Sequence, residues 1–247
     1  VDWYRGELER LVQAIEEHFS VKIGQEDLLG AIKLHNQTRQ NLIKLNELRK
    51  TQNPSISGQE ALTISIAAQV MPLNVFNKLL EQFLEGLDIR TPNQYKSRFI
   101  VSGGELDEPD FIKIIEDQGG LVIYDDTCFG SRYYQNLISE EGDPLENIAA
   151  RYLYKVPCAR FLNSFSPRYE NLMDVAKNYQ ADGIIFQRLT FCVANGGHMQ
   201  MLTHVAKTDE TAVPVLFLDR EYLASGSGQI KTRVQAFIES VEANKRR

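Results

Sequence analysis

Three cysteines are the residues of this chain with the most informative chemistry. Cys128 lies in YDDTCFGSR, Cys158 in YKVPCAR and Cys192 in FQRLTFCVANGG. A free thiol is most often a small buried hydrophobe, and its other roles are nucleophile, redox partner and metal ligand. Cys128 stands among acidic residues, a glycine and an arginine, and Cys192 follows an apolar run by several residues. A core thiol needs neither setting, so we take a chemical role as a working hypothesis.

The spacing of the cysteines excludes two of these roles. Cys128 and Cys158 are 30 positions apart and Cys158 and Cys192 are 34 apart, so the chain has no Cys-x-x-Cys pair. A thioredoxin-like redox site and a zinc ribbon both use that pair. Thiolates from distant loops can still hold one iron–sulfur cluster, because each comes from its own strand end.

Other polar groups near the cysteines support weaker interpretations. Arg132 and Arg188 could stabilise negative charge on a cluster or a radical anion, although a surface ion pair is the more common role for an arginine. Backbone amides in SGG, residues 102–104, and NGG, residues 195–197, could hydrogen-bond sulfides. His198 stands at an expected helix start, where a capping or solvent-facing role is favoured over a ligand role.

Four apolar runs must position these groups. They are SRFIVSGG, GGLVIYDD, DGIIFQRL and VPVLFLDR, each ending in polar or glycine-rich residues, as is typical of strands buried on both faces. Helical patterns are expected at Pro109–Gln118, Pro167–Tyr179, His198–Val205 and Gln229–Glu242. The alternation predicts an α/β fold with a mostly parallel, flavodoxin-like sheet that carries helices on both faces.

In such a fold, ligands gather outside the carboxyl ends of the strands. Cys128 follows one expected strand and Cys192 another, so both thiols should lie at the same edge of the sheet. Cys158 is harder to place. Its segment, residues 152–156, reads as a short edge strand or a loop, and Pro157 excludes a regular central strand.

The front of the chain has a different pattern. Residues 1–92 are helical in pattern throughout, and the strand-like runs begin only after them, which predicts a helical segment at 1–92 and an α/β domain at 93–247. The chain opens inside a helical pattern without an initiator methionine. We therefore expect that a preceding region of the natural protein is missing.

Composition limits the class of protein. The net charge is −6 with a pI near 5.4, which gives no general attraction to nucleic acid or an anionic membrane. No apolar stretch approaches the roughly 20 residues that span a bilayer, and the first residues do not show a basic region followed by an apolar signal core. Three cysteines do not suit a secreted disulfide framework, so a cytoplasmic location is expected.

Several motifs together carry a family resemblance. They are Asp-Asp-x-Cys-x-Gly-x-Arg around Cys128, VPCAR around Cys158, Asp-Gly-Ile-Ile with the later Phe-Cys of Cys192, and Gly-Gln-x-x-Thr-Arg near the end. With EDLLGAIKLHNQTR in the helical part, the chain resembles the 2-hydroxyacyl-CoA dehydratase and benzoyl-CoA reductase family. Within it, the 2-hydroxyglutaryl-CoA dehydratase D-component is most similar.

The resemblance implies an oxygen-sensitive 4Fe–4S cluster or, in one branch, a double-cubane cluster, held by cysteines that match Cys128, Cys192 and Cys158. It implies a heterodimer with a related subunit, and a separate ATP-hydrolysing activator that delivers low-potential electrons for dehydration or ring reduction of an acyl-CoA. The chain itself shows no nucleotide-binding motif. It departs from the family at its front, where the usual N-terminal α/β region, with a further cysteine, is absent.

A second function class stays open at this point. The chain could be a non-catalytic accessory protein that binds a partner subunit or a double-cubane cluster. Iron and acid-labile sulfide in the anaerobic protein would distinguish the enzyme from a metal-free accessory chain.

Overall fold

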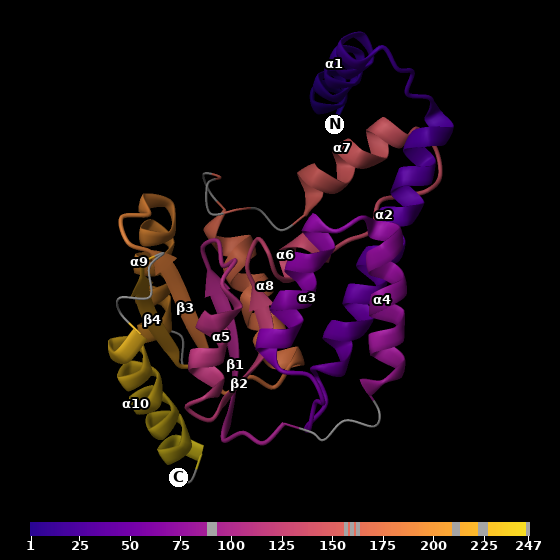
Figure 1. Ribbon diagram of the computed structural model, residues 1–247. Coiled ribbons are helices and arrows are strands. Elements are labelled where there is room, and N and C mark those ends of the chain that lie inside the picture. Colours follow the sequence, from indigo (N-terminus) through magenta and orange to yellow (C-terminus); the bar gives the residue numbers. More distant parts are fainter. Residues whose placement is uncertain are drawn as a thin grey trace.

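The fold is a parallel sheet between two layers of helices, with a further helical layer at one side (Figure 1). The computed structural model describes residues 1–87, 93–155, 158, 161, 164–208, 213–221 and 227–245. The strands are β1 Ser97–Gly103, β2 Gly120–Asp126, β3 Gly183–Leu189 and β4 Val215–Arg220. All neighbours pair in parallel in the order β2-β1-β3-β4, as in flavodoxin-like sheets. The predicted α/β class is confirmed.

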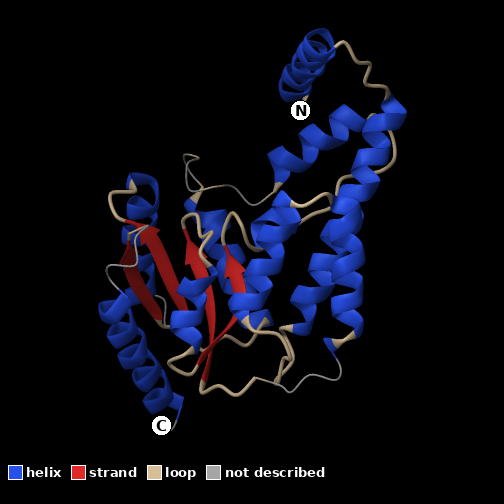
Figure 2. Ribbon diagram, in the orientation of Figure 1, coloured by secondary structure: helices blue, strands red, loops and turns tan. Residues whose placement is uncertain are grey.

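Helices cover both faces of this sheet, as predicted (Figure 2). They are α1 Asp2–Phe19, α2 Gln25–Leu48, α3 Gly58–Val70, α4 Leu73–Glu85, α5 Pro109–Glu116, α6 Ser131–Tyr134, α7 Pro144–Tyr154, α8 Phe165–Asn178, α9 Val193–Thr208 and α10 Ser227–Lys245. Side chains of α3, α5 and α10 pack on one face, and side chains of α8 and α9 pack on the other.

The central strands contain continuous apolar stretches because both of their faces are covered. Every residue of β1 is buried, with Phe99 and Val101 facing the layer of α5 and Ile100 facing the layer of α8. Burying one such side chain contributes about 1.5 to 3 kcal/mol relative to leaving it exposed. The continuous apolar runs of the sequence are therefore explained by a two-sided core.

The helices of the first part of the chain form a second core. Leu42 and Leu45 of α2 pack there with Phe76 and Leu80 of α4. Helix α3 contributes to this core and also contacts β2 and α5. Helix α3, which belongs to the expected helical segment, thus also covers the sheet. The expected division into a helical segment at 1–92 and an α/β domain at 93–247 stays a prediction. Residues 88–92 lie outside the described residues.

Two local expectations were wrong. Tyr152 to Tyr154 form the last turn of α7, rather than an edge strand or a loop, because the pattern of PLENIAARYLY continues a helix whose N-cap is Asp143. His198 lies inside a helix and not at its start, as described with the site below. Val156 and Pro157 lie outside the described residues. Among the helices that the structure describes, none is long and apolar enough to cross a bilayer.

Candidate functional site at the carboxyl edge of the sheet

Three cysteines line one cavity of about 50 Å³ at the carboxyl edge of the sheet. Cys128 follows β2, Cys192 follows β3, and Cys158 follows α7. Gly103, the last residue of β1, and Gly104 after it supply another wall. The chain passes from β1 to β2 on one side and later to β3 on the other, so the cavity lies at the switch point of the sheet, where ligands bind in such folds.

The turn after β2 holds Cys128 out of the core. The Gly130 backbone N–H donates to the hydroxyl of Thr127 at 3.1 Å. A Cβ at Gly130 would lie 2.5 Å from the carbonyl oxygen of Asp125, so the tight turn requires glycine there. The thiol of Cys128 is consequently exposed, although the residues around it are buried.

Asp126 fixes Arg132 beside the thiols. Its carboxylate accepts hydrogen bonds from Arg132 Nε and Nη2 at 2.8 and 2.7 Å, and from Ser102 Oγ at 2.8 Å. Burial opposes ionisation of Asp126, but Arg132 and these hydrogen bonds hold its pKa below the usual value. Arg132 is therefore part of a buried ion pair and not a surface one, whereas Arg188 makes a partly exposed pair with Asp219.

The Cys128 thiol is not an activated nucleophile in this arrangement. Burial raises its pKa, although the nearby charge of Arg132 acts in the opposite direction. A thiol with a raised pKa stays protonated near neutral pH, and the thiolate is the reactive form. Metal binding also requires the thiolate, so a cluster bound at Cys128 would release this proton.

Asn195 is a site residue that sequence reasoning missed. It is buried in α9, and its Nδ2 donates a hydrogen bond to Cys192 Sγ at 3.4 Å. Gly104 leaves room for this contact, because a Cβ there would lie 3.2 Å from Asn195 Nδ2. The sequence offered one signal, the NGG segment, but that was interpreted through its backbone amides only.

His198 lies in the interior and does not cap a helix, which corrects the expectation from the sequence. Helix α9 begins at Val193, so His198 is inside it and packs against the rings of Phe165 and Phe186, each with its centroid 5.2 Å away. Neither imidazole nitrogen has a hydrogen-bond partner among the described residues. Burial, together with the charge of Arg168, lowers the pKa of His198 to about 3.

Arg168 of α8 is a second buried cation near the thiols. It is 3% exposed, and its Nε and Nη2 have no hydrogen-bond partner in the part of the chain that the structure describes. Burial and the charge of Arg132 lower its pKa to about 10, so the guanidinium remains charged at neutral pH. No motif marks this residue, because its burial depends on how α8 lies on the sheet.

The three cysteine thiols are the type of ligand that an iron–sulfur cluster requires. Within the described ranges, no group of three or more Cys, His, Asp or Glu side chains is arranged around one point where a metal ion could bind. In a cluster, however, each thiolate binds its own iron, so the ligands surround a volume and do not meet at a point. Three thiols around one cavity, with Arg132 beside them, fit that requirement.

Comparison with known proteins shows the family of the chain. The model of the family described as 2-hydroxyglutaryl-CoA dehydratase, D-component, matches residues 1–241. The chain belongs to this family.

The curated relatives of the chain have low sequence identity to it and are longer. The putative dehydratase subunit YjiM of Escherichia coli (strain K12) is 26% identical over 248 residues, which cover 96% of the chain and 63% of YjiM. A benzoyl-CoA reductase subunit of Thauera aromatica is 24% identical, with coverages of 98% and 63%. The (R)-phenyllactyl-CoA dehydratase beta subunit of Clostridium sporogenes is 22% identical, with 93% and 61%. The chain thus spans a little over three fifths of these relatives.

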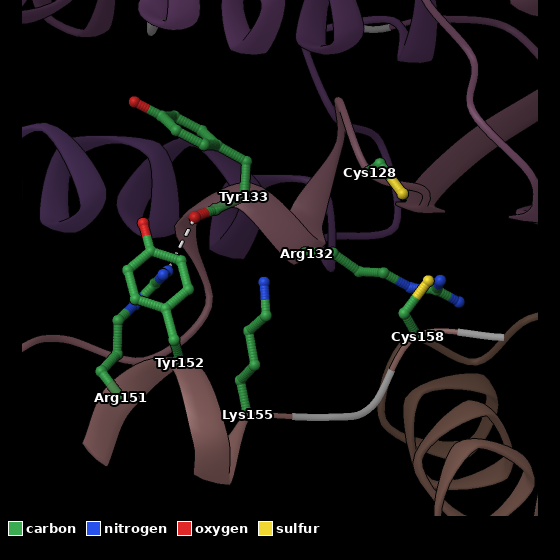
Figure 3. Close-up of a pocket in the computed structure, with 7 residues that line it drawn as sticks. All are labelled: Cys128, Arg132, Tyr133, Arg151, Tyr152, Lys155 and Cys158. Atoms are coloured by element: carbon green, nitrogen blue, oxygen red, sulfur yellow. Dashed lines mark hydrogen bonds between the residues drawn. The ribbon is translucent and has the colours of Figure 1, made fainter. Parts of the chain in front are cut away.

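A second, larger cavity adjoins the thiol cavity of the D-component family chain (Figure 3). Its volume is about 160 Å³, and it shares Cys128, Arg132 and Cys158 with the first cavity. The rest of its described wall consists of Tyr133, Arg151, Tyr152 and Lys155. The two cavities place the thiols between a glycine-rich wall and a basic, aromatic one.

Proposed function

We propose that this chain forms the cluster-binding part of a subunit of an iron–sulfur acyl-CoA dehydratase or reductase, with Cys128, Cys158 and Cys192 as cluster ligands. The observation that carries the proposal is that these thiols come from three separate loops to one cavity at the switch point of the sheet. Membership of the D-component family supports the acyl-CoA chemistry.

The bound cluster would supply one-electron transfer at low potential. The chain's own residues hold and tune the site. Asp126 orients Arg132, whose positive charge stabilises negative charge that develops beside the thiols. Asn195 donates its N–H to the Cys192 sulfur, and such hydrogen bonds to sulfur set the redox properties of a thiolate ligand.

The partners belong to the same proposal. Two of the relatives are named as parts of a reductase and a dehydratase, which supports assembly with a related subunit. We further propose a separate ATP-hydrolysing activator as the electron donor, an acyl-CoA as the substrate and a cytoplasmic location.

Anaerobic reconstitution with iron and sulfide tests the ligand assignment. The full-length protein should bind both and absorb broadly in the visible range, and Cys128→Ala, Cys158→Ala and Cys192→Ala should each lose iron and acyl-CoA turnover while keeping the native circular dichroism spectrum. Ser139→Ala, in an exposed turn, is the control and should retain both. Unchanged iron content in Cys128→Ala would overturn the assignment. A metal-free wild-type protein that still binds its partner subunit would instead favour an accessory role.

A further inference from the structure

The larger cavity concentrates positive charge. Arg132, Arg151 and Lys155 line it together with Tyr133 and Tyr152, and no described lining residue is acidic. Figure 3 shows the Lys155 side chain extending into the space between Tyr152 and Arg132. The protein as a whole has a net charge of −6, so this excess of cations is local and opposite to the overall balance.

The charge of Arg132 is balanced, but the other two charges are not. Asp126 neutralises Arg132 through two hydrogen bonds. Arg151 is 7% exposed and donates only to neutral backbone carbonyl groups among the described residues, those of Asn136 at 3.1 Å, Tyr133 at 2.9 Å and Gln135 at 3.0 Å. Lys155 forms no ion pair with any described residue.

A further cation lies behind the aromatic wall. Arg39 of α2 is 4% exposed, and its Nη1 donates to the neutral side chain of Asn36 at 3.3 Å. Its Nε has no partner within the described ranges. Burial and the charge of Arg151 lower the pKa of Arg39, whereas Tyr152 and Tyr133 on the cavity wall act in the opposite direction. Arg39, Arg151 and Lys155 therefore form a group of three cations without a paired carboxylate among the described residues.

A buried charge is unfavourable unless an opposite charge approaches it, and Arg39 and Arg151 are both buried. The neighbouring sequence KVPCARFLNS, residues 155–164, contains no acidic residue that could do so. Thiolates at Cys128 and Cys158, which line the same cavity, would offset part of the charge of Lys155. An anionic ligand would balance the charge that remains at the buried Arg151 and Arg39.

We propose that the cavity lined by Lys155, Arg151, Tyr133 and Tyr152 binds a phosphate group. A carboxylate would balance one of the three positive charges, whereas a phosphate monoester balances close to two and offers three terminal oxygens. Lysine and arginine are the common phosphate ligands in proteins. A volume of about 160 Å³ accommodates a phosphate and the atoms joined to it.

The phosphate group could come from either of two kinds of ligand. One is a free anion, phosphate or pyrophosphate, and the other is a coenzyme A thioester. The proposal goes beyond the proposed function and does not depend on it, because the metal-free chain already has the cationic wall. A chain that binds phosphate but no iron would leave this proposal standing and reject the cluster assignment.

Calorimetric titration of the metal-free chain at low ionic strength measures the binding directly. The probes are inorganic phosphate, pyrophosphate, coenzyme A, pantetheine and glutarate. We expect phosphate-bearing probes to bind, pantetheine to fail, and affinity to fall with added salt. Binding of coenzyme A at least tenfold tighter than pyrophosphate would assign the thioester as the source, and equal or weaker binding would assign the free anion.

Lys155→Met removes the central charge at a half-buried position and should weaken phosphate binding at least tenfold with an unchanged circular dichroism spectrum. Lys177→Met makes the same charge change on the exposed end of α8 and should leave the affinity unchanged. Arg151→Met should also weaken binding, although it removes the hydrogen bonds that Arg151 donates to three carbonyls as well.

Four results would overturn the proposal. Lys155→Met could bind phosphate as the wild type does, or both lysine variants could weaken binding equally. Glutarate could bind as tightly as pyrophosphate, or no phosphate-bearing probe could bind.

Discussion

Arg49 and Asp125 form a buried ion pair that joins the helical layer to the strand preceding Cys128. Arg49 Nη1 lies 3.3 Å from Asp125 Oδ1, and Arg49 Nη2 donates to the carbonyl of Val122 at 2.8 Å. Both side chains are 1% exposed. The position of α2 and the end of β2 are consequently fixed by the same guanidinium.

Arg49→Met should destabilise the protein strongly, because it leaves the Asp125 carboxylate buried without its partner. Removing one member of a buried pair costs about 3 to 5 kcal/mol. Urea unfolding monitored by circular dichroism gives the value. The double variant Arg49→Met with Asp125→Asn should recover part of the loss, and a loss below about 1 kcal/mol in the single variant would show that the pair does not hold the two layers together.

His198 should make the protein less stable in mild acid. Its pKa is lowered to about 3 in the fold from a usual value of 6.5, so the unfolded chain binds a proton between these pH values and the folded chain does not. Unfolding free energy should therefore fall as pH drops from 6.5 towards 3, by at most about 1.4 kcal/mol for each pH unit from this residue.

The variant His198→Leu isolates that contribution, since leucine has a similar volume between the two phenylalanine rings. Its stability should depend less steeply on pH in the same range, as measured by urea unfolding at several pH values. Parallel curves for the wild type and the variant would contradict the neutral, buried state of His198.

Gly103 should not tolerate any side chain. It has φ 127°, and a Cβ there would lie 1.8 Å from the carbonyl oxygen of Gln187 in β3. Gly103→Ala should cost at least about 3 kcal/mol, because the carboxyl ends of β1 and β3 would have to separate. Gly142 also has a positive φ but open space around it, so Gly142→Ala should cost only about 1 to 2 kcal/mol. Similar losses in both variants would mean that backbone strain alone explains Gly103.

Asn195→Ala should lower the reduction potential of a cluster bound by the full-length protein, because it removes the N–H that donates to the Cys192 sulfur. A redox titration followed by electron paramagnetic resonance measures the shift, and iron content should stay unchanged. Asn178→Ala, at the exposed end of α8, is the matched control. An unchanged potential in Asn195→Ala would show that this hydrogen bond does not persist in the loaded protein.

The sequence by itself determined the order and class of the elements. The runs at residues 97–103 and 120–126 read as strands buried on both faces, because each holds a short apolar stretch that ends in polar or glycine-rich residues. Parallel strands then put Cys128 and Cys192 at one edge, a consequence of chain direction alone. The family resemblance was equally a property of the sequence, since it depends on motifs.

Only the tertiary structure decided which polar side chains meet at that edge. Cys158 reaches the cavity from a segment whose pattern left an edge strand or a loop open, and Asn195 meets Cys192 because Gly104 leaves space for it. The burial of His198 depends on how α8 and α9 lie on the sheet, and the cations at Arg39 and Arg151 come from helices distant in sequence. Local periodicity shows which face of an element is apolar, but contacts and uncompensated charges arise between elements, and they exist only once the packing is fixed.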